Sequence, residues 1–316
     1  MSNKILITDS LFIFDEHVKQ LEAAGYEVER LDKPQATEEE LCQAVKGKIG
    51  YILGGIEKIT DKVIESADQL KAIAFTGIDY KNFIPGWEEA TKKGIAIANA
   101  PDGPTQAVTE WAIGATLLMN RSFLELGRTG DKSFATTTGI ENQNIGIIGF
   151  GRIGQLIAEI LGPFRPKSVH YWSPNTRDDS GTAKYNDLDE VLSKSDILYL
   201  AVPASAQGLL DRDRVNKIKK NALLVTFTHG KVIDEVALLE RLQANEVRAI
   251  SDDPVDDSAF NDLPLSSWFC FNGSNAFNTE SEIKTVSDTV VVSILNLLKT
   301  GYDQYQVNSD INHPAS

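Results

Sequence analysis

Short runs of apolar residues alternate along the first hundred positions with longer stretches in which apolar side chains recur every three to four residues. The short runs are typical of strands buried on both faces, and the longer stretches are typical of amphipathic helices. The pattern predicts strands at residues 5–8, 27–31, 51–53, 72–75 and 95–98, and helices at 16–24, 37–45, 61–66 and 87–93. Strands that alternate with helices in this way indicate a parallel sheet covered by helices.

A second alternation of the same kind begins near residue 144, with strands predicted at 145–148, 168–172, 197–201, 222–226 and 248–251. No low-complexity or Pro-rich linker separates the two series, so a helix at 104–120 is expected to connect them. A second helix, at 278–298, would return the chain to the first series. The predicted domains are therefore 1–99 together with 282–316, and 100–281, each an α/β domain with a doubly wound parallel sheet.

Composition and charge exclude several classes of partner. The chain has 316 residues, with 31 Lys and Arg against 45 Asp and Glu, which gives a net charge of −14. Such an acidic surface repels nucleic acid and anionic lipid, so neither is an expected partner. The uncharged, largely apolar stretches 111–120 and 289–298 have ten residues each, about half the length that spans a bilayer. Two cysteines, Cys42 and Cys270, suit neither a disulfide framework nor a metal site, which favours a reducing, cytoplasmic location.

A glycine-rich motif provides the main chemical signal. Gly149, Gly151 and Gly154 form a GxGxxG pattern between a predicted strand and an amphipathic stretch, the context in which this motif indicates a bound dinucleotide. The first glycine would permit a tight turn, the second a close approach of pyrophosphate, and the third the packing of helix on strand. Arg152 and Ile153 open the following helix, whose N-terminus suits phosphate. A glycine-rich turn without a ligand is the alternative.

The segment after the next strand bears on the choice between NAD and NADP. In NAD-binding proteins an acidic residue about 20 residues after the motif binds the adenosine ribose. Here the segment contains Ser173, Asn175, Thr176 and Arg177, with no acid before Asp178. Hydroxyls and a guanidinium suit the 2′-phosphate of NADP, which a carboxylate would repel. The sequence therefore leans slightly towards NADP, and an Arg177 that is only a solvated loop residue is an equal alternative.

Several segments, in the same order and spacing, resemble the D-isomer-specific 2-hydroxyacid dehydrogenase family over nearly the whole chain. They are residues 70–74, 90–99, 100–110, 146–154, 195–203 and 221–235. The resemblance implies two Rossmann-like domains with a cleft between them, NAD or NADP on the central domain, and a homodimer built mainly on that domain. It also implies hydride transfer between the nicotinamide and a small 2-oxo or 2-hydroxy acid.

The three catalytic positions of that family are all substituted here. The family's Arg, which binds the substrate carboxylate, corresponds to His229. Its Glu, which holds the catalytic His and raises that residue's pKa, corresponds to Asp257 or, less well, to Asp256. The catalytic His itself corresponds to Ser274. None of the other three histidines lies near that position, so the usual proton donor is absent.

Two hypotheses follow from these substitutions. In the first, the protein is an oxidoreductase in which His229 transfers the proton and Asp257 orients it, while Lys81 or Lys231 helps to bind a substrate anion. In the second, it is a catalytically inactive NAD(P)-binding or regulatory module, because Ser274 cannot act as an acid at neutral pH. A His229 that only fills a hydrogen-bonded loop is also an open interpretation.

Positions that contact the cofactor in the family are better preserved. Asp252 corresponds to the residue at the nicotinamide carboxamide, and Thr228, Val202 and Pro203 correspond to residues that line the cofactor. Because Asp252 lies in an acidic run without His or Cys partners, a solvated loop is favoured there over a metal site.

The family's substrate loop is only partly preserved. Gly77 and Ile78 correspond to the loop that in the family holds the substrate carboxylate, and Lys81 follows them. Asp79 replaces a second glycine of that loop and would oppose an anion. We therefore expect a small-molecule substrate that differs from a simple 2-hydroxy acid.

Overall fold

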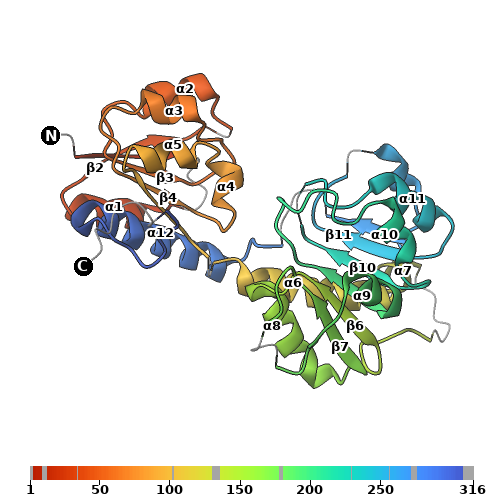
Figure 1. Ribbon diagram of the computed structural model, residues 1–316. Coiled ribbons are helices and arrows are strands. Elements are labelled where there is room, and N and C mark those ends of the chain that lie inside the picture. Colours follow the sequence, from red (N-terminus) through yellow and green to blue (C-terminus); the bar gives the residue numbers. More distant parts are fainter. Residues whose placement is uncertain are drawn as a thin grey trace. The chain divides into compact units, whose positions relative to one another are not determined.

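The computed structural model describes residues 3–8, 13–33, 35–101, 103–129, 136–177, 181–228, 230–255, 257–271 and 276–308. They form two compact units, Met1–Pro104 with Asn278–Ser316 (the first unit) and Thr105–Phe277 (the second unit) (Figure 1). The junctions lie beside α6 (Thr105–Asn120) and α12 (Glu280–Thr300), not after residue 99 and before residue 282. Ala100 donates its N–H to the carbonyl of Gly77 at 3.1 Å, which keeps the segment before α6 with the first unit.

The first unit contains a five-stranded parallel sheet in the order β2-β1-β3-β4-β5. Its strands are β1 (Lys4–Thr8), β2 (Glu27–Leu31), β3 (Gly50–Leu53), β4 (Ala72–Phe75) and β5 (Ala96–Asn99). The order is doubly wound, with its reversal between β1 and β3.

Alternate strand residues of the first unit face opposite layers of helices. On one face, Leu6 and Ile73 pack with α2 (Glu38–Ala44), α3 (Asp61–Ser66) and α5 (Trp87–Lys92). On the other, Ile5 and Ile52 pack with α1 (Asp15–Ala23) and α12. Figure 1 shows α1 and α12 side by side, with α2 and α3 across the sheet from them. Helix α12 thus returns the chain to the first unit, as the sequence predicts.

The segment after α12 runs along the edge strand β5. Asn308 Oδ1 accepts the N–H of Ile97 at 2.8 Å, and its Nδ2 donates to the carbonyl of Ile95 at 2.9 Å. Asp303 is buried and accepts a hydrogen bond from Ser293 Oγ of α12 at 2.9 Å. This segment satisfies backbone groups that an edge strand otherwise presents to other chains.

The second unit contains a seven-stranded parallel sheet in the order β12-β11-β10-β9-β6-β7-β8. Its strands are β6 (Asn144–Ile148), β7 (Ser168–Trp172), β8 (Lys184–Tyr185), β9 (Ile197–Leu200), β10 (Leu223–Thr226), β11 (Arg248–Ser251) and β12 (Trp268–Cys270). This is the Rossmann order, in which β6 lies at the reversal between β7 and β9.

Helices cover both faces of the second sheet. Ile145 and Ile147 of β6 pack against α6 and α8 (Arg152–Leu161), whereas Ile148 and Leu198 pack against α9 (Leu188–Lys194), α10 (Arg212–Lys217) and α11 (Glu235–Gln243). A short helix, α7 (Phe123–Thr129), follows α6. Both units are therefore the α/β domains that the sequence predicts.

Candidate functional site

The glycine turn lies at the carboxyl end of β6, where the strand order of the second sheet reverses. Gly149 has a φ of +94°, a conformation that L side chains rarely adopt, and its N–H donates to the carbonyl of Trp172 at 2.8 Å. A Cβ added to Gly149 would lie 2.3 Å from the carbonyl oxygen of Ala201. The turn therefore requires glycine here whether or not a ligand binds.

The other two glycines of the motif differ from one another. A Cβ on Gly154 would lie 2.3 Å from the carbonyl oxygen of Gly149, so close packing of α8 on the turn requires this glycine. Gly151 has an ordinary extended conformation, with φ of −77° and ψ of −162°, and a Cβ there would meet no atom within 4 Å. Neither backbone nor packing explains Gly151. A ligand that occupies the open space beside it does, which is the fit expected for a pyrophosphate.

Helix α8 begins directly after this open position. Arg152 is exposed and Ile153 is half-buried against the core of the second unit. The first N–H groups of a helix have no partner within the helix and carry its positive dipole end, so they favour an anion. The turn and the start of α8 thus offer the two features with which α/β domains bind phosphate.

The carboxyl end of β7 bears the residues predicted to contact the adenosine ribose. Ser173 is buried and its hydroxyl donates to the carbonyl of Asn175, while Asn175, Thr176 and Arg177 are exposed. This segment is therefore a tight turn in which Ser173 is buried and the side chains of residues 175–177 are exposed.

Tyr171 shapes that turn and carries no obvious signal in the sequence. Its hydroxyl accepts the N–H of Arg177 at 3.0 Å and lies 3.3 Å from the carbonyl oxygen of the same residue. Its ring stacks on Phe150 of the glycine turn, with ring centroids 3.9 Å apart. The phenol thus joins the two loops that would hold the two ends of an adenosine diphosphate group. A large polar aromatic residue on the inward face of β7 is the only clue that the sequence offers.

Three of the predicted cofactor residues lie where β9 and β10 leave the sheet. Thr228 is buried, and its hydroxyl lies 2.9 Å from the carbonyl oxygen of Leu200 and 3.0 Å from that of Val202. Val202 is half-buried and Pro203 is exposed. The structure therefore brings these three residues together beside the glycine turn.

Asp252 follows β11, the next strand along the same edge, and is only 1% exposed. Its Oδ2 accepts the N–H of Ala276 at 2.9 Å.

The Cys270 thiol lies near this carboxylate and donates to the carbonyl of Asp253 at 3.4 Å. Burial, and then the carboxylates of Asp252 and Asp253, raise the pKa of this thiol. Cys270 is thus held as a neutral thiol and is a poor nucleophile.

Of the predicted catalytic residues, only Asp257 is described. It is exposed, and its Oδ1 accepts the N–H of Ala259 at 2.9 Å, which caps the short helix Ser258–Asp262. His229 and Ser274, like Asp256, lie outside the described residues. No group of three or more potential metal ligands occurs among the residues that the structure describes.

The predicted substrate residues belong to the first unit, at the carboxyl end of β4. A Cβ on Gly77 would lie 2.8 Å from the ring of Phe75, and Ile78 is exposed. The ammonium of Lys81 lies 4.5 Å from the ring centroid of Trp87. These residues are thus on a separate unit from the glycine turn.

Lys58 is a further cation at this end of the first sheet that the sequence pattern does not reveal. Its Nζ donates to the carbonyl of Asn82 at 2.7 Å and to Asn82 Oδ1 at 3.1 Å. Burial lowers the pKa of this ammonium, and the Asp79 carboxylate partly offsets the shift. Its position after β3, at the same edge as Gly77, is the signal that could have identified it.

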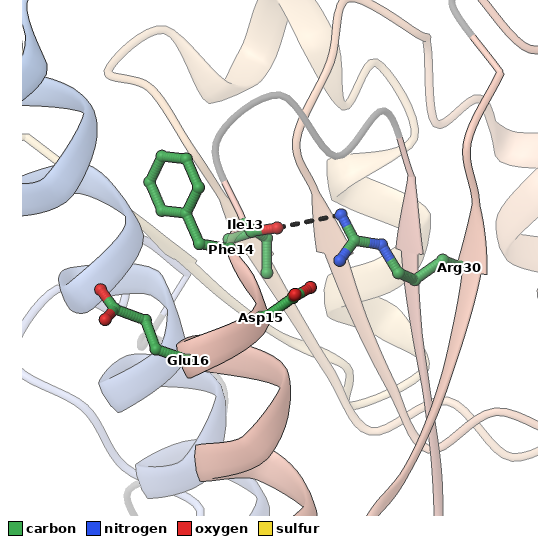
Figure 2. Close-up of a pocket in the computed structure, with 5 residues that line it drawn as sticks. All are labelled: Ile13, Phe14, Asp15, Glu16 and Arg30. Atoms are coloured by element: carbon green, nitrogen blue, oxygen red, sulfur yellow. Dashed lines mark hydrogen bonds between the residues drawn. The ribbon is translucent and has the colours of Figure 1, made fainter.

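One cavity of the first unit lies apart from all predicted site residues. Figure 2 shows this cavity, of about 590 Å³, with Arg30 of β2 reaching the start of α1, where Nη2 donates to the carbonyl of Ile13 at 2.9 Å. Its lining residues are Ile13, Phe14, Asp15, Glu16 and Arg30. Figure 2 shows Asp15 on the side of the engaged guanidinium, whereas Glu16 points away from it and lies 3.5 Å from the ammonium of Lys284. This arrangement assigns no ligand.

Known proteins share both the sequence and the fold. The NAD binding domain of D-isomer specific 2-hydroxyacid dehydrogenases matches residues 117–268. A glyoxylate reductase of Pyrococcus furiosus is 32% identical over 262 residues, which cover 77% of this chain and 76% of that protein. The chain belongs to the D-isomer-specific 2-hydroxyacid dehydrogenase family. The second unit, which contains the match and the glycine turn, is the NAD(P)-binding domain of this family member.

Further relatives set the extent of the likeness. A D-3-phosphoglycerate dehydrogenase of Methanocaldococcus jannaschii is 31% identical to this family member over 327 residues, 96% of this chain and 59% of that protein. This chain therefore spans less than two thirds of that relative's length. A solved acyclic imino acid reductase, in complex with NADPH and D-Arg, has a TM-score of 0.84 at 24% identity and covers 96% of this chain and 99% of its own. That likeness shows the fold alone. Among the described residues, no helix combines the length and apolar character needed to cross a membrane.

Proposed function

We propose that this protein is an NAD(P)-dependent oxidoreductase that transfers hydride between the nicotinamide and a small 2-oxo or 2-hydroxy acid, or a related carbonyl compound, with altered catalytic residues. The observation that carries this proposal is the open space at Gly151, between two glycines that packing alone requires. Family membership supports the same cofactor class. When bound, the nicotinamide supplies or accepts the hydride.

The order of the second sheet supports a proposed position for each half of the dinucleotide. With the pyrophosphate at the β6–α8 turn, the adenosine half extends over β7 on one side and the nicotinamide half over β9, β10 and β11 on the other. Gly149, Gly151 and the start of α8 would hold the phosphates. The preserved residues Val202, Thr228 and Asp252 would then lie beside the nicotinamide half.

A direct test replaces Gly151 with valine. Because a Cβ there meets no protein atom within 4 Å, we expect unchanged thermal stability but at least about tenfold weaker NADH and NADPH binding, measured by fluorescence titration. Gly114→Val is the matched control, since a Cβ on that α6 glycine also meets nothing within 4 Å. Binding that survives Gly151→Val unchanged would contradict the proposal.

We favour NADP over NAD on the basis of the β7 turn. Ser173 occupies the position of the acid that binds ribose in NAD-dependent proteins, and Asn175, Thr176 and Arg177 are exposed beside it. Ser173→Asp is expected to shift the preference towards NADH, because its carboxylate would repel a 2′-phosphate. The ratio of the two dissociation constants measures this shift, and a ratio that does not move would remove the assignment.

The chemical step is assigned to His229, with Asp257 as its orienting carboxylate and Ser274 in the place of the usual histidine. Because Oδ1 of Asp257 caps a helix, we assign the orienting role to its Oδ2. Lys81 would help to bind the substrate anion. His229→Ala is expected to abolish any turnover and leave cofactor affinity nearly unchanged, whereas retained turnover would refute this role.

The alternative is a catalytically inactive NAD(P)-binding module. The specific observation that favours it is the replacement of the catalytic Arg and His positions by His229 and Ser274, residues of different chemistry. A panel of 2-oxo acids, aldehydes and ketones, followed at 340 nm with NADPH and NADH, separates the two. Cofactor binding without turnover on any member of the panel would favour the inactive module.

We also infer a homodimer formed through the second unit. Phe123 and Leu126 of α7 are large apolar side chains that are exposed in the single chain, and a second copy would cover them. Sedimentation of the unaltered protein and of the double variant Phe123→Glu, Leu126→Glu tests this interface. A monomeric unaltered protein would overturn the inference.

A further inference from the structure

Hydrogen bonds beyond the regular ladders join the strand ends on both sides of the glycine turn. Gly149 donates its N–H to the carbonyl of Trp172, and Ala201 donates its N–H to that of Ile148 at 2.7 Å. These bonds connect β7 to β6 and β6 to β9. Between β9 and β10 the connection is made by a side chain, the hydroxyl of Thr228, two residues after β10 ends.

The Thr228 hydroxyl has two carbonyl acceptors that lie on either side of Ala201. It is 2.9 Å from the oxygen of Leu200 and 3.0 Å from that of Val202, in a side chain only 8% exposed. One hydroxyl hydrogen is thus shared between the last residue of β9 and the loop that follows. This contact fixes the direction in which the chain leaves the sheet.

The segment that Thr228 holds also forms a wall of the glycine turn. A Cβ on Gly149 would lie 2.3 Å from the carbonyl oxygen of Ala201 and 2.9 Å from Cγ1 of Val202. A displacement of the 201–203 segment therefore changes the space on the nicotinamide side of the turn, whereas the β7 turn, held by Tyr171, is on the other side.

We propose that Thr228 is a positioning residue whose hydroxyl sets the 201–203 segment against the nicotinamide half of the dinucleotide, and that it acts through this segment. This inference rests on the proposed function. In this inference the Thr228 hydroxyl contacts protein and does not contact the cofactor.

The test compares variants that keep or remove the hydroxyl. Thr228→Val preserves the shape and loses the hydrogen bond, Thr228→Ala serves if valine prevents folding, and Thr228→Ser restores the donor. Thr116→Val is the matched control, because that buried hydroxyl also has two oxygen partners, the carbonyl of Ala112 at 2.8 Å and the hydroxyl of Tyr199 at 2.7 Å. Thermal unfolding of every variant identifies any that fail to fold.

The decisive measurement compares the binding of the whole dinucleotide with the binding of its adenosine half. The unaltered protein and each variant would be titrated with the dinucleotide that the unaltered protein binds more tightly and, separately, with the adenosine half of that dinucleotide. The two ligands are therefore either NADPH and 2′,5′-ADP, or NADH and ADP-ribose. We expect Thr228→Val to weaken binding of the dinucleotide about tenfold, the equivalent of one lost hydrogen bond, and to leave the adenosine half unchanged. Thr228→Ser and Thr116→Val should bind both as the unaltered protein does.

The outcomes separate this inference from the proposed function. Equal weakening of both ligands would indicate a general structural role for Thr228 and overturn the inference, as would unchanged binding of the dinucleotide. A loss in Thr228→Ser as large as in Thr228→Val would also overturn it. Failure of the unaltered protein to bind either dinucleotide would refute the proposed function itself and the inference with it.

Discussion

The two units each place a glycine-containing loop at the carboxyl end of a parallel sheet, but the reasons why glycine occupies these positions differ. In the first unit, a Cβ on Gly77 would strike the ring of Phe75 at 2.8 Å. In the second, Gly149 and Gly154 are likewise required by close contacts, and Gly151 alone faces open space. A glycine that packing requires carries no information about a ligand. One that packing does not require leaves room for a ligand, and only the second unit has such a glycine in its predicted site, directly before a helix.

The same difference extends to the charged groups around each loop. In the first unit, Lys58 is engaged by Asn82 and interacts electrostatically with the carboxylate of Asp79, and Lys81 lies over the ring of Trp87. In the second, the start of α8 faces the open position at Gly151. The cations around the first loop are therefore already engaged by other groups of the first unit. This agrees with the weaker preservation of the family's substrate residues relative to its cofactor residues.

The largest expected effect is on Gly149. Gly149→Ala would force an L side chain into a φ of +94° and place its Cβ 2.3 Å from a carbonyl oxygen. We expect a loss of about 3 kcal/mol or more in the free energy of unfolding, measured by urea denaturation. Gly25→Ala is the matched control, because Gly25 has a φ of +93° and no atom within 4 Å of its Cβ. An equal loss in both variants would show that backbone strain, not the contact with Ala201, requires the glycine.

A smaller effect is expected for the glycine of the first unit. Gly77→Ala would press against Phe75 and lower the free energy of unfolding by about 1–3 kcal/mol, a typical cost of overpacking. In a double-mutant cycle, Phe75→Leu should relieve part of that cost because the ring that the Cβ meets is gone. Additive effects would mean that Gly77 is required for another reason, such as a ligand, and would remove the contrast between the two units.

The fold was largely predictable because strands buried on both faces leave unbroken apolar runs. All ten predicted strands match a strand of the structure to within one residue at each end. The two strands that were not predicted, β8 and β12, have two and three residues. Both lie at an edge of the second sheet, where pairing on one side needs little apolar sequence.

Residues of the candidate site could be predicted from the sequence only where the backbone conformation or close packing permits a single residue type. Gly149 and Gly154 follow from such requirements. The contributions of Tyr171 and Thr228 do not, because both side chains act on backbone groups of other segments, and no local sequence pattern records those contacts. His229 and Ser274 lie outside the described residues, so their roles stay predictions.

The smallest expected effect concerns the amino end of the second sheet, opposite the glycine turn. Asp196 precedes β9 and accepts the N–H of Asn144 at 2.8 Å and the ammonium of Lys219 at 2.5 Å. Burial alone would raise the pKa of this carboxyl, but these donors hold it below its ordinary value of 3.8. Its contribution to stability is therefore present above pH 3.8 and is lost as the pH falls through the lower pKa of the folded state.

Asp196→Asn should accordingly lower the free energy of unfolding by about 1–2 kcal/mol at neutral pH. The difference from the unaltered protein should shrink as the pH falls below 3.8, because the native carboxyl then becomes protonated. Urea denaturation followed by tryptophan fluorescence measures this, since three of the four tryptophans, Trp111, Trp172 and Trp268, lie in the second unit. A difference that stays constant with pH would mean that the carboxylate charge does not hold β6, β9 and β10 in register, and that packing alone fixes the strands on which the glycine turn is built.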